Sequence, residues 1–469
     1  MTAAMTDDLH YHEIMQLAPR IQAGDVSPVA VTRAQLDRIA ALDGTLASYA
    51  LVMADSAMAQ AQAAEAEIAG GHYRGPLHGV PIAVKDLFWT KGVPTAGGMA
   101  IYKEFRPAED ATVVRRLRDA GAVLLGKLQM TEGAYSDYHP SVTPPKNPWD
   151  AAYWAGISSS GPGVATAAGL CFGALGSDTG GSIRWPCAAN GLTGLKPTWG
   201  RVSRHGAFEL AATLDHVGPM ARSVGDAAAI LAAIAGSDSN DPTALLHPVP
   251  DYLAAVGQGV RGLRIGVDPV WNSDDVDPAT QAVLSETAAV FRSLGAEIVD
   301  VRFPNVTQAI VDWVPNCAVE AAVAHQATYP ARKAEYGPVL ASVLEVGRAL
   351  SGVDYQEILL RRLDLRGRVA ALFSGIDLLL IPVHPFAPLS LARIQTLGEQ
   401  PELIVNLSRY TFPFDMTGSP TITQPGGFSE AGLPIAFQLV AADLGESTLI
   451  RAGAAYQGVT SWHRRHPIA

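Results

Sequence analysis

Charged residues, cysteines and long apolar runs are all scarce in this sequence, and each shortage argues against a class of partner or of structural site. Only 17% of the 469 residues are charged, against about 25% in a typical soluble domain. The formal net charge of −11 disfavours a nucleic-acid partner, and no cluster of basic residues offsets it. No apolar run approaches the roughly 20 residues that cross a bilayer. We therefore expect neither a nucleic acid nor a membrane as a partner.

The chain has three cysteines, Cys171, Cys187 and Cys317. Their odd number and irregular spacing argue against a disulfide framework and against a cysteine-based zinc site, so we interpret them as small buried hydrophobes. The acidic start, MTAAMTDDLHYHEI, lacks the apolar core of a secretory signal. Together these features predict a cytoplasmic protein.

Apolar residues are abundant, at 48%, and the chain has 45 glycines and 32 prolines, a composition typical of a compact protein with many loops. Apolar runs at 79–88 and 122–127 predict two strands. The stretch 111–121 between them predicts a helix, with Asp110 as its N-cap. A strand, a helix and a strand in this order suggest a βαβ unit in a mixed or parallel sheet.

Helix signals and strand signals continue to alternate along the rest of the chain. Ser27-Pro28 is typical of an N-cap followed by the first residue of a helix, and residues 54–69 predict a second helix. Ser223 begins a third, which ends at Gly236. Further strands are predicted at 263–267, 297–301, 377–383 and 434–441, and further helices at 278–294, 355–373 and 447–457. Residues 303–355 show no clear pattern.

Because this alternation has no break, we expect one large α/β domain spanning residues 1–469. A helical N-terminal layer occupies about 1–70, the core about 71–240 and a C-terminal half about 241–469. No internal repeat or long linker divides these regions.

Glycine is concentrated in one segment, with twelve of the 51 residues from Gly156 to Gly206. Asp178 is the only charged residue in the first half of that segment. In GSDTGGSIRWP (176–186), two adjacent glycines precede Ser182 and permit backbone angles that other residues avoid. A serine where backbone N–H groups converge is what an acyl-transfer enzyme needs. A tight turn between a strand and a helix explains the same residues.

A serine nucleophile needs a base, and histidine is the usual one. His78, His139 and His205 are the histidines nearest to the glycine-rich parts, but a surface or structural role explains each of them, and no G-x-S-x-G elbow is present. Lys85 is the alternative, because it lies in an apolar run, VPIAVKDLF, where burial favours the neutral amine. An ordinary ion pair with Asp86 explains Lys85 equally simply.

Three motifs occur in a fixed order along the chain. They are LHGVPIAVKDLF with GVPTAGG after it, GISSSGPGVATAAGLCFGALGSDTGGSIRWPCAANGLTGLKPTWGRVSRHG (156–206), and FPFDMTGSPTITQPGGF (412–428) followed by GLPIAFQLVA. Together they resemble the amidase signature family. The resemblance extends from about residue 8 to the end and is weakest near 303–400. It implies an α/β fold whose central sheet is twisted, mixed and mostly parallel, with helices on its sides.

The resemblance also implies three catalytic residues. Ser182 matches the nucleophile that forms the acyl-enzyme, and Lys85 matches the base. Ser158 matches a bridging serine that follows a cis peptide bond and relays the proton between the other two. No metal and no other cofactor is implied.

Other residues of the site are implied in the same way. The oxyanion hole is expected from the backbone N–H groups of Thr179, Gly180, Gly181 and Ser182. Asp178 and Arg184 are expected to form a structural pair that holds the loop, since charges so near the site are otherwise costly. We expect Ser159 and Ser177 to hydrogen-bond within the site.

The serine run departs from the usual form of the family motif. Ile157 and Ser160 stand where glycines are usual, and Pro162 stands where a serine is usual. The three catalytic positions are intact. A serine at position 160 resembles the allophanate-hydrolase branch of the family.

The resemblance implies hydrolysis of an amide C–N bond, with esters and carbamates as related substrates. Several aromatic residues are candidates for lining an apolar pocket, although ordinary packing explains most of them; they are Tyr135, Tyr138, Tyr153, Trp154, Trp313, Tyr410, Phe412 and Phe414. We expect a monomer or homodimer acting on aryl or alkyl amides, anilides or carbamates. The alternatives are the glutamine-hydrolysing component of a tRNA-dependent amidotransferase complex, an allophanate-type hydrolase of urea derivatives, and a non-catalytic binding protein.

Overall fold

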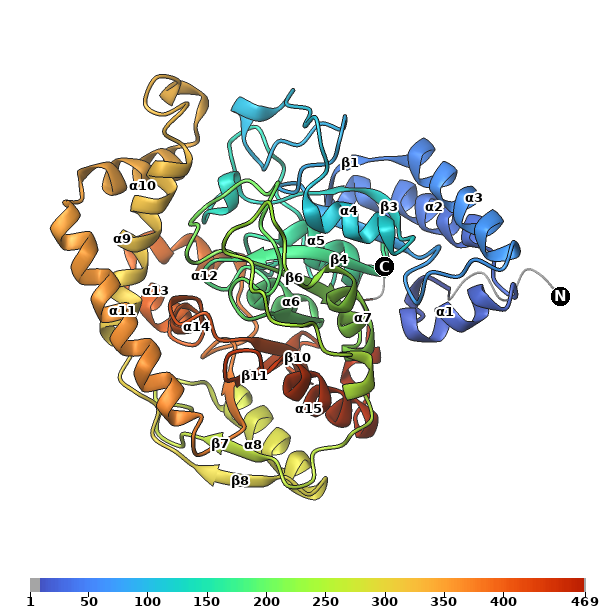
Figure 1. Ribbon diagram of the computed structural model, residues 1–469. Helices are drawn as coiled ribbons and strands as arrows, with labels where there is room; N and C mark the ends of the chain where they lie inside the picture. Colours follow the sequence, from blue (N-terminus) through green and yellow to red (C-terminus); the bar gives the residue numbers. More distant parts are fainter. Residues whose placement is uncertain (1–8, 468–469) are drawn as a thin grey trace.

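The computed structural model describes residues 9–467 and is built around one eleven-stranded sheet (Figure 1). The strands lie side by side in the order β1-β3-β2-β4-β6-β5-β10-β11-β9-β7-β8. Their bounds are β1 (Tyr49–Val52), β2 (Pro81–Lys85), β3 (Val123–Leu128), β4 (Gly173–Asp178), β5 (Thr193–Lys196), β6 (His216–Ala221), β7 (Arg264–Val267), β8 (Glu297–Asp300), β9 (Leu378–Pro382), β10 (Thr421–Phe428) and β11 (Pro434–Ala441).

Strand directions in this sheet are mixed. β2 runs parallel to β3 and β4, and β7 runs parallel to β8 and β9. The six remaining pairings are antiparallel. The predicted mixed α/β sheet is therefore confirmed, but the expectation that it is mostly parallel is wrong. Strands joined without a crossover helix pair antiparallel, and both β5–β6 and β10–β11 are joined in that way.

Helices flank the sheet. Their bounds are α1 (Ile14–Gln22), α2 (Pro28–Leu46), α3 (Ala54–Ala69), α4 (Thr112–Asp119), α5 (Ser160–Ala167), α6 (Arg184–Asn190), α7 (Val224–Ile234), α8 (Pro278–Ser293), α9 (Thr307–Ala324), α10 (Pro338–Ala349), α11 (Gly352–Leu372), α12 (Leu391–Gln395), α13 (Pro401–Ser408), α14 (Phe412–Met416) and α15 (Glu446–Val459). Figure 1 shows α1–α3 at one end of the molecule and α9–α11 at the other.

The predicted cap at Ser27 is present at the start of α2. Its Oγ accepts a hydrogen bond from the N–H of Ala30 at 3.1 Å, and Pro28 is the first helical residue. Ser223 caps α7 in the same way, through the N–H of Asp226 at 3.1 Å. Side-chain acceptors at these positions satisfy N–H groups that lack a partner within the helix.

The predicted cap at Asp110 is wrong. Helix α4 begins at Thr112, so Asp110 lies one residue before the cap position, Ala111. The Asp110 carboxylate accepts a hydrogen bond from the N–H of Lys91 at 2.7 Å instead.

The region 303–355, which showed no pattern, contains two helices, α9 and α10, and the first turn of α11. Pro315 lies inside α9, and proline in a helix interior is unfavourable, which hides the helix signal. The side chain of Ser351 caps α11 by accepting from the N–H of Asp354 at 3.1 Å.

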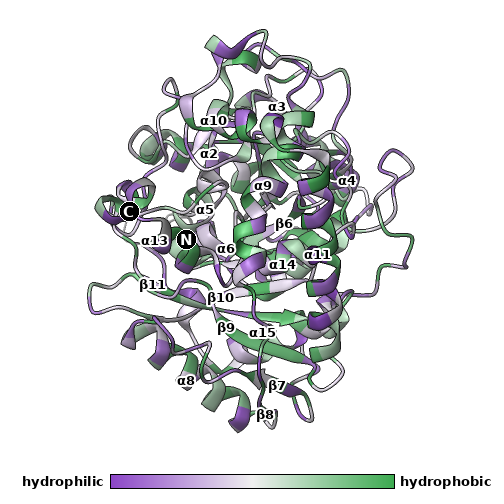
Figure 2. Ribbon diagram, turned by 90° about the vertical axis from the view of Figure 1, so that its left-hand side faces the viewer, coloured by the Kyte–Doolittle hydropathy of each residue, from purple (hydrophilic) through white to green (hydrophobic). Residues whose placement is uncertain are grey.

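The main hydrophobic core lies between the sheet and the helices, and it includes residues from α1 to α15. Figure 2 shows apolar colouring along the central strands and hydrophilic stretches on outer helices such as α8 and α11. Strands β2 and β4 are buried along their whole length. In the part of the chain that the structure describes, no helix is long and apolar enough to cross a membrane.

Helices α1–α3 lie within residues 1–70, and α2 and α3 pack on each other and on β3. The first eight residues of that range lie outside the described part of the chain. Strands from all three predicted regions join the same sheet.

Candidate active site

The site begins where two parallel strands end. β2 and β4 are neighbours, and Lys85 is the last residue of β2 while Asp178 is the last residue of β4. Parallel strands present their carboxyl ends at the same edge of a sheet. The sheet therefore brings together the lysine motif and the glycine-rich motif, which are about ninety residues apart.

The Lys85 ammonium group contacts three serine hydroxyls. Its Nζ lies 2.7 Å from Ser158 Oγ, 2.9 Å from Ser159 Oγ and 2.8 Å from Ser177 Oγ. Lys85 is completely buried, and no carboxylate takes part in these contacts. Lys85 does not form the ion pair with Asp86 that the sequence allows; Asp86 lies 3.5 Å from Lys127 instead.

Burial lowers the pKa of Lys85 to about 7, although the charges of Asp178 and Asp215 act in the opposite direction. A large fraction of this lysine is therefore a neutral amine at neutral pH. A neutral amine has a lone pair that accepts a proton, which an ammonium ion lacks.

The hydroxyl proton of Ser159 already takes part in a hydrogen bond. Ser159 Oγ donates to the backbone carbonyl of Ser177 at 3.1 Å, so towards Lys85 it acts as an acceptor. When Lys85 is neutral, its lone pair is therefore directed to the hydroxyl of Ser158 or of Ser177.

The backbone of the serine run is held from two sides. Gly156 has φ +78°, and a Cβ at that position would lie 2.4 Å from the Cα of Pro186, so only glycine fits against the start of α6. The carbonyl of Ser158 accepts from the N–H of Thr131 at 3.4 Å. The peptide bond between Ile157 and Ser158 is cis.

Ser160 and Pro162, two departures from the usual motif, begin helix α5. Ser160 Oγ accepts a hydrogen bond from the hydroxyl of Tyr138 at 2.6 Å. Pro162 is the third residue of α5, where a backbone N–H has no partner within the helix. Ser160 thus ties the serine run to the loop that carries Tyr138.

Ser182 lies in the loop between β4 and α6 and is 8% exposed. The carboxylate of Asp178 organises this loop. It accepts hydrogen bonds from the N–H groups of Gly181 at 2.6 Å and of Ile183 at 2.9 Å. The N–H of Gly181 is therefore engaged, and its expected place in the oxyanion hole is wrong.

The three other expected N–H donors, those of Thr179, Gly180 and Ser182, differ from that of Gly181. The carbonyl of Thr179 accepts from Trp313 Nε1 at 2.8 Å. Because the carbonyl and N–H of one trans peptide point in opposite directions, the N–H of Gly180 points away from Trp313. In the described chain, the N–H groups of Thr179, Gly180 and Ser182 donate to no protein acceptor.

Arg184 pairs with Asp178 through two contacts, Nε to Oδ2 at 3.0 Å and Nη2 to Oδ1 at 2.8 Å. Both side chains are completely buried. Burial raises the pKa of Asp178, but the Arg184 charge and the N–H donors outweigh it and hold the pKa below its ordinary value. A carboxylate that stays ionised at any ordinary pH thus supports the loop.

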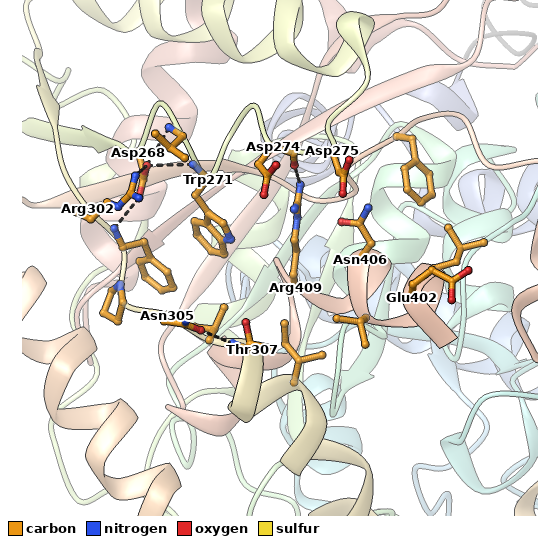
Figure 3. A pocket seen from close by; sticks show the side chains of 18 of the residues that line it. Asp268, Trp271, Asp274, Asp275, Arg302, Asn305, Thr307, Glu402, Asn406 and Arg409 are labelled. Atoms are coloured by element: carbon orange, nitrogen blue, oxygen red, sulfur yellow. Dashed lines mark hydrogen bonds and ion pairs between the residues drawn. The ribbon is translucent and has the colours of Figure 1, made fainter. Parts of the chain in front are cut away.

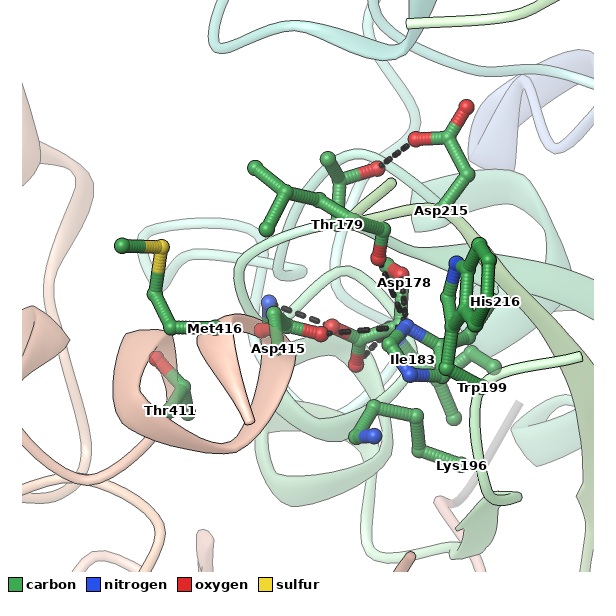
Figure 4. Close-up of polar contacts among 12 residues, drawn as sticks. Asp178, Thr179, Ile183, Lys196, Trp199, Asp215, His216, Thr411, Asp415 and Met416 are labelled. Carbon is green, nitrogen blue, oxygen red and sulfur yellow. Dashed lines mark hydrogen bonds and ion pairs between the residues drawn. The ribbon is translucent and has the colours of Figure 1, made fainter. Parts of the chain in front are cut away.

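Arg184 also pairs with a second carboxylate, which the sequence did not indicate. Asp415, from α14, lies 2.5 Å from Arg184 Nη2 (Figure 4). It is 231 residues away along the chain, so no local spacing marks it. Burial raises the pKa of Asp415 well above its ordinary value, and burial lowers that of the nearby Lys196 to about 8.

Asp215 is a second carboxylate that the sequence did not indicate. It accepts from Thr179 Oγ1 at 2.7 Å and from the N–H groups of Leu210 and Ala211 (Figure 4). Burial raises its pKa to about 6. Asp215 therefore anchors the start of the loop that ends at Ser182.

The predicted aromatic residues do not form one pocket. Phe412 stacks on Trp313 with ring centroids 3.9 Å apart, and a Cβ on Gly180 would lie within 2.7 Å of both rings, so this pair covers the loop before Ser182. Phe414, two residues later, is 0% exposed and packs on Phe303. Its expected place in the pocket is wrong, because that ring belongs to the core.

The remaining predicted aromatics lie at different places. Trp154 packs against Trp185, with ring centroids 5.9 Å apart, and Tyr153 forms an isolated bridge with Ser390. The carbonyl of Tyr135 accepts from Thr131 Oγ1 at 2.5 Å, in the same loop as Tyr138. Tyr410 is completely buried.

The three histidines nearest to the glycine-rich parts of the sequence contact none of the serines in this site. His78 lies 3.3 Å from Glu67, His205 lies 3.6 Å from Glu109, and His139 bonds to Ser141. Among residues 9–467, no group of three or more His, Cys, Asp or Glu side chains is arranged to hold a metal ion.

A family model described as Amidase matches residues 30–450 of this chain. The chain belongs to the amidase family. It is an amide-hydrolysing enzyme, as the sequence motifs indicated, and its large mixed sheet flanked by helices is that of the amidase signature fold.

Other amidases resemble this one over almost their whole length. A Mycobacterium tuberculosis protein named "Putative amidase AmiD" is 49% identical over 456 residues, which cover 97% of this chain and 95% of that protein. A glutamyl-tRNA(Gln) amidotransferase subunit from Geobacter sp. is 37% identical, with 97% and 98% covered. The crystal structure of a bacterial aryl acylamidase has a TM-score of 0.87 and 25% identity, with 97% and 98% covered.

One large cavity of this amidase does not adjoin the site. It has a volume of about 980 Å³ and lies beside α13, between Asp268, Arg302 and Arg409 (Figure 3). Neither Lys85, nor the serine run, nor any residue of 177–184 lines it.

Proposed function

We propose that this amidase cleaves amide C–N bonds through an acyl-enzyme on Ser182, with Lys85 as the base and Ser158 as the proton relay. The observation that carries the proposal is the buried contact between Lys85 Nζ and Ser158 Oγ at 2.7 Å. It is supported by a lysine whose burial lowers its pKa to about 7, where a general base is most effective.

The first half of the reaction forms the ester. Neutral Lys85 takes the proton of the Ser158 hydroxyl while Ser158 takes the proton of Ser182, and the freed Ser182 Oγ attacks the amide carbon. A tetrahedral intermediate forms, with its negative charge on the former carbonyl oxygen. Return of the proton from Lys85 through Ser158 to the leaving nitrogen allows the C–N bond to break, and the amine departs.

The second half uses the same relay in reverse order. Water attacks the acyl carbon and loses its proton through Ser158 to Lys85. When the intermediate collapses, Ser182 Oγ leaves and receives that proton. The carboxylic acid is released and the serine is restored, so neither a redox partner nor a co-reactant other than water is needed.

The negative charge of the intermediate needs fixed donors. The free N–H groups of Thr179, Gly180 and Ser182 are the candidates, since that of Gly181 is bound to Asp178. Donors that are already oriented stabilise a developing oxyanion by about 2.7–4 kcal/mol each. In this proposal, Asp178 and Arg184 do not touch the substrate; they keep the loop in the shape that aligns these donors.

Ser159 and Ser177 hold the amine of Lys85 in place. Because Ser159 is fixed as an acceptor by its bond to the Ser177 carbonyl, the lone pair of Lys85 is left for the hydroxyl of Ser158 or of Ser177. We assign the proton exchange to Ser158, because Ser158 is the position that matches the bridging serine of the family motif.

For the substrate, we propose aryl or alkyl amides, including anilides, with carbamates as a related class. The apolar surroundings of the loop, where Phe412 and Trp313 stack beside Gly180, suit an apolar group. The likeness to an aryl acylamidase supports the same choice. We propose that the enzyme acts alone, as a monomer or homodimer.

A second candidate is favoured by the 37% identity to an amidotransferase subunit. In that case the enzyme hydrolyses glutamine and needs partner proteins. An allophanate-type hydrolase of urea derivatives is the third candidate, suggested by the serine at position 160.

A substrate panel on the purified chain separates these candidates. The proposal predicts turnover of acetanilides, benzamides or phenyl carbamates without partners, and loss of that turnover in Ser182→Ala. Turnover of glutamine alone, and only with added partner proteins, would establish the second candidate, and turnover of allophanate alone the third. A chain that hydrolyses no member of the panel contradicts the proposal.

A further inference from the structure

Trp313, from helix α9, donates a hydrogen bond to the backbone of the Ser182 loop, residues 179–183 between β4 and α6. Its Nε1 lies 2.8 Å from the carbonyl oxygen of Thr179, three residues before Ser182. Trp313 is 7% exposed, so this bond is largely shielded from water. A buried tryptophan N–H usually finds an acceptor. Here the acceptor is a peptide of the loop that carries the proposed nucleophile, so the bond fixes the orientation of that peptide.

The orientation of this peptide decides where one N–H group points. The peptide between Thr179 and Gly180 is trans, so its N–H points away from its carbonyl. Because Trp313 holds the carbonyl, the N–H of Gly180 is directed to the opposite side, where it donates to no protein acceptor of the described chain. The next N–H, that of Gly181, is bound to Asp178 at 2.6 Å. Trp313 and Asp178 thus orient two successive peptides, and the first of them keeps its N–H free.

Packing requires glycine at position 180, and glycine leaves this peptide free to rotate. A Cβ on Gly180 would lie 2.6 Å from Cζ2 of Trp313 and 2.7 Å from Cε1 of Phe412, so no side chain fits. Glycine populates positive and negative φ about equally, and the 179–180 peptide can therefore turn over at little steric cost. A turned peptide would present the Thr179 carbonyl oxygen in place of the Gly180 N–H. The indole N–H opposes that rotation because it binds the carbonyl.

Helix α9 is anchored to the segment that holds the other polar group of Thr179. Glu320, two turns after Trp313 in α9, accepts from the N–H of Thr213 at 2.7 Å and from its hydroxyl at 2.6 Å. Thr213 lies two residues before Asp215, which accepts from the hydroxyl of Thr179 at 2.7 Å (Figure 4). The side chain and the carbonyl of Thr179 are therefore both attached to one connected set of contacts, so the indole meets the loop in a fixed position.

We propose that Trp313 is a positioning residue for the oxyanion hole: its indole N–H holds the Thr179 carbonyl so that the N–H of Gly180 faces the negative oxygen of the tetrahedral intermediate. In this role the indole acts through the Thr179–Gly180 peptide and not on the substrate. The inference deepens the proposed function and rests on it, because it presupposes attack by Ser182. Since the oxyanion exists only after that attack, the N–H of the indole contributes to kcat and not to substrate binding.

Two substitutions separate the N–H of the indole from its bulk. Trp313→Phe keeps an apolar ring and removes the donor. Trp313→His is smaller and more polar, but imidazole superimposes on the pyrrole half of indole, which puts Nε2 at the position of the tryptophan Nε1, and a neutral imidazole carries one N–H. If Trp313 only packs, Trp313→Phe is the more active variant. If it acts as a donor, Trp313→His has the higher kcat.

The two variants should lose different kinetic parameters on acetanilide. We expect Trp313→Phe to lower kcat by about 10- to 100-fold with KM nearly unchanged, which is less than the 10²–10³-fold cost of deleting an oxyanion donor, because the Gly180 N–H remains and loses only its orientation. Trp313→His should keep most of kcat while KM rises, since the benzo ring is gone. The pH midpoint of Trp313→Phe should stay in place, because Lys85 contacts the three serines and not the indole.

A trifluoromethyl ketone probes the oxyanion hole without turnover. With trifluoroacetophenone, Ser182 Oγ adds to the ketone carbon, its proton passes through Ser158 to Lys85, and the ketone oxygen becomes the oxyanion. The adduct carries the charge of the tetrahedral intermediate, so its Ki should rise in Trp313→Phe by about the factor by which kcat/KM falls. Trp313→His should restore most of the affinity.

Trp149 provides a matched control. Its Nε1 donates to the carbonyl of Asn190, the last residue of α6, at 3.0 Å. Trp149→Phe therefore deletes the same kind of indole–carbonyl bond outside the Ser182 loop. A urea titration should show a lower midpoint for this variant, as for Trp313→Phe, whereas its kcat and its Ki for the ketone should equal those of the wild type.

The inference is overturned if Trp313→Phe keeps the kcat of the wild type, or if its kcat falls while its Ki for the ketone does not change. Trp313→His tests the inference independently, should Trp313→Phe not fold: a folded Trp313→His chain that loses about 100-fold or more in kcat also overturns it. Failure of the proposed function looks different, because the wild-type chain then hydrolyses no amide and Ser182 forms no adduct with the ketone.

Discussion

The pH dependence of hydrolysis follows from the burial of Lys85. Burial lowers the pKa of this lysine to about 7, and only the neutral amine accepts a proton from Ser158. From that value, about a tenth of the enzyme carries neutral Lys85 at pH 6 and about nine-tenths at pH 8. We therefore expect kcat/KM to rise about 10-fold from pH 6 to its plateau above pH 8.

The assay uses initial rates on an amide that does not titrate, such as acetanilide, between pH 5.5 and 9.5. Because kcat/KM reports groups of the free enzyme, the midpoint is assigned to Lys85 with a control. Lys127 is a second buried lysine, whose pKa is lowered to about 8 by burial, and it contacts Thr95 and the carbonyl of Phe88 rather than the serines. Lys127→Met should leave the midpoint where it is.

Replacing Asp215 should shift the midpoint of the pH profile in a direction that the structure predicts. Its buried carboxylate acts to raise the pKa of Lys85, so Asp215→Asn should move the midpoint to lower pH, while the amide oxygen still accepts from Thr179. A rate that is flat down to pH 5.5, or a midpoint that moves with Lys127→Met, would refute the assignment of the base to Lys85.

Three further outcomes are expected. Ser158→Ala should lower kcat by about 10²–10⁴-fold without changing the circular dichroism spectrum, because it removes only the relay; an unchanged kcat would exclude that role. Asp178→Asn should cost about 3–5 kcal/mol of stability, seen as a lower urea midpoint, because it leaves Arg184 buried with less compensating charge; a midpoint equal to that of the wild type would argue against this. Tyr138→Phe should cost about 1 kcal/mol in the same urea titration, through the lost bond to Ser160, and no loss would show that the bond contributes nothing.

Local sequence signals predicted most of the elements. Strands such as β2 and β11 are short apolar runs, and the caps at Ser27 and Ser223 are side-chain contacts within three residues, so the sequence alone contains the information. Asp110 shows the limit of local signals for locating helix ends. It is a good capping residue, but it lies one position before the cap position of α4. Strand direction was not predicted correctly either, because it depends on connections rather than on periodicity.

The site was predicted only where residues are close in sequence or belong to a motif. The motifs placed Lys85 and the serines together, and the structure brings Lys85 and Ser158 within 2.7 Å. Asp415 was not found, because its partner Arg184 is 231 residues away. Aromatic composition cannot tell which way a ring faces: Phe412 covers the loop before Ser182, while Phe414, two residues later, lies in the core.

The central claim, that Ser182 carries the acyl group, is tested most directly by mass spectrometry of the enzyme during turnover. The chain is mixed with a slowly hydrolysed aryl ester or carbamate, quenched with acid and digested, and the modified peptide is sequenced. We expect an added acyl mass on Ser182, which is absent in Ser182→Ala and forms more slowly in Ser158→Ala. An acyl group found on Ser158, or turnover with no acylated serine at all, would contradict it.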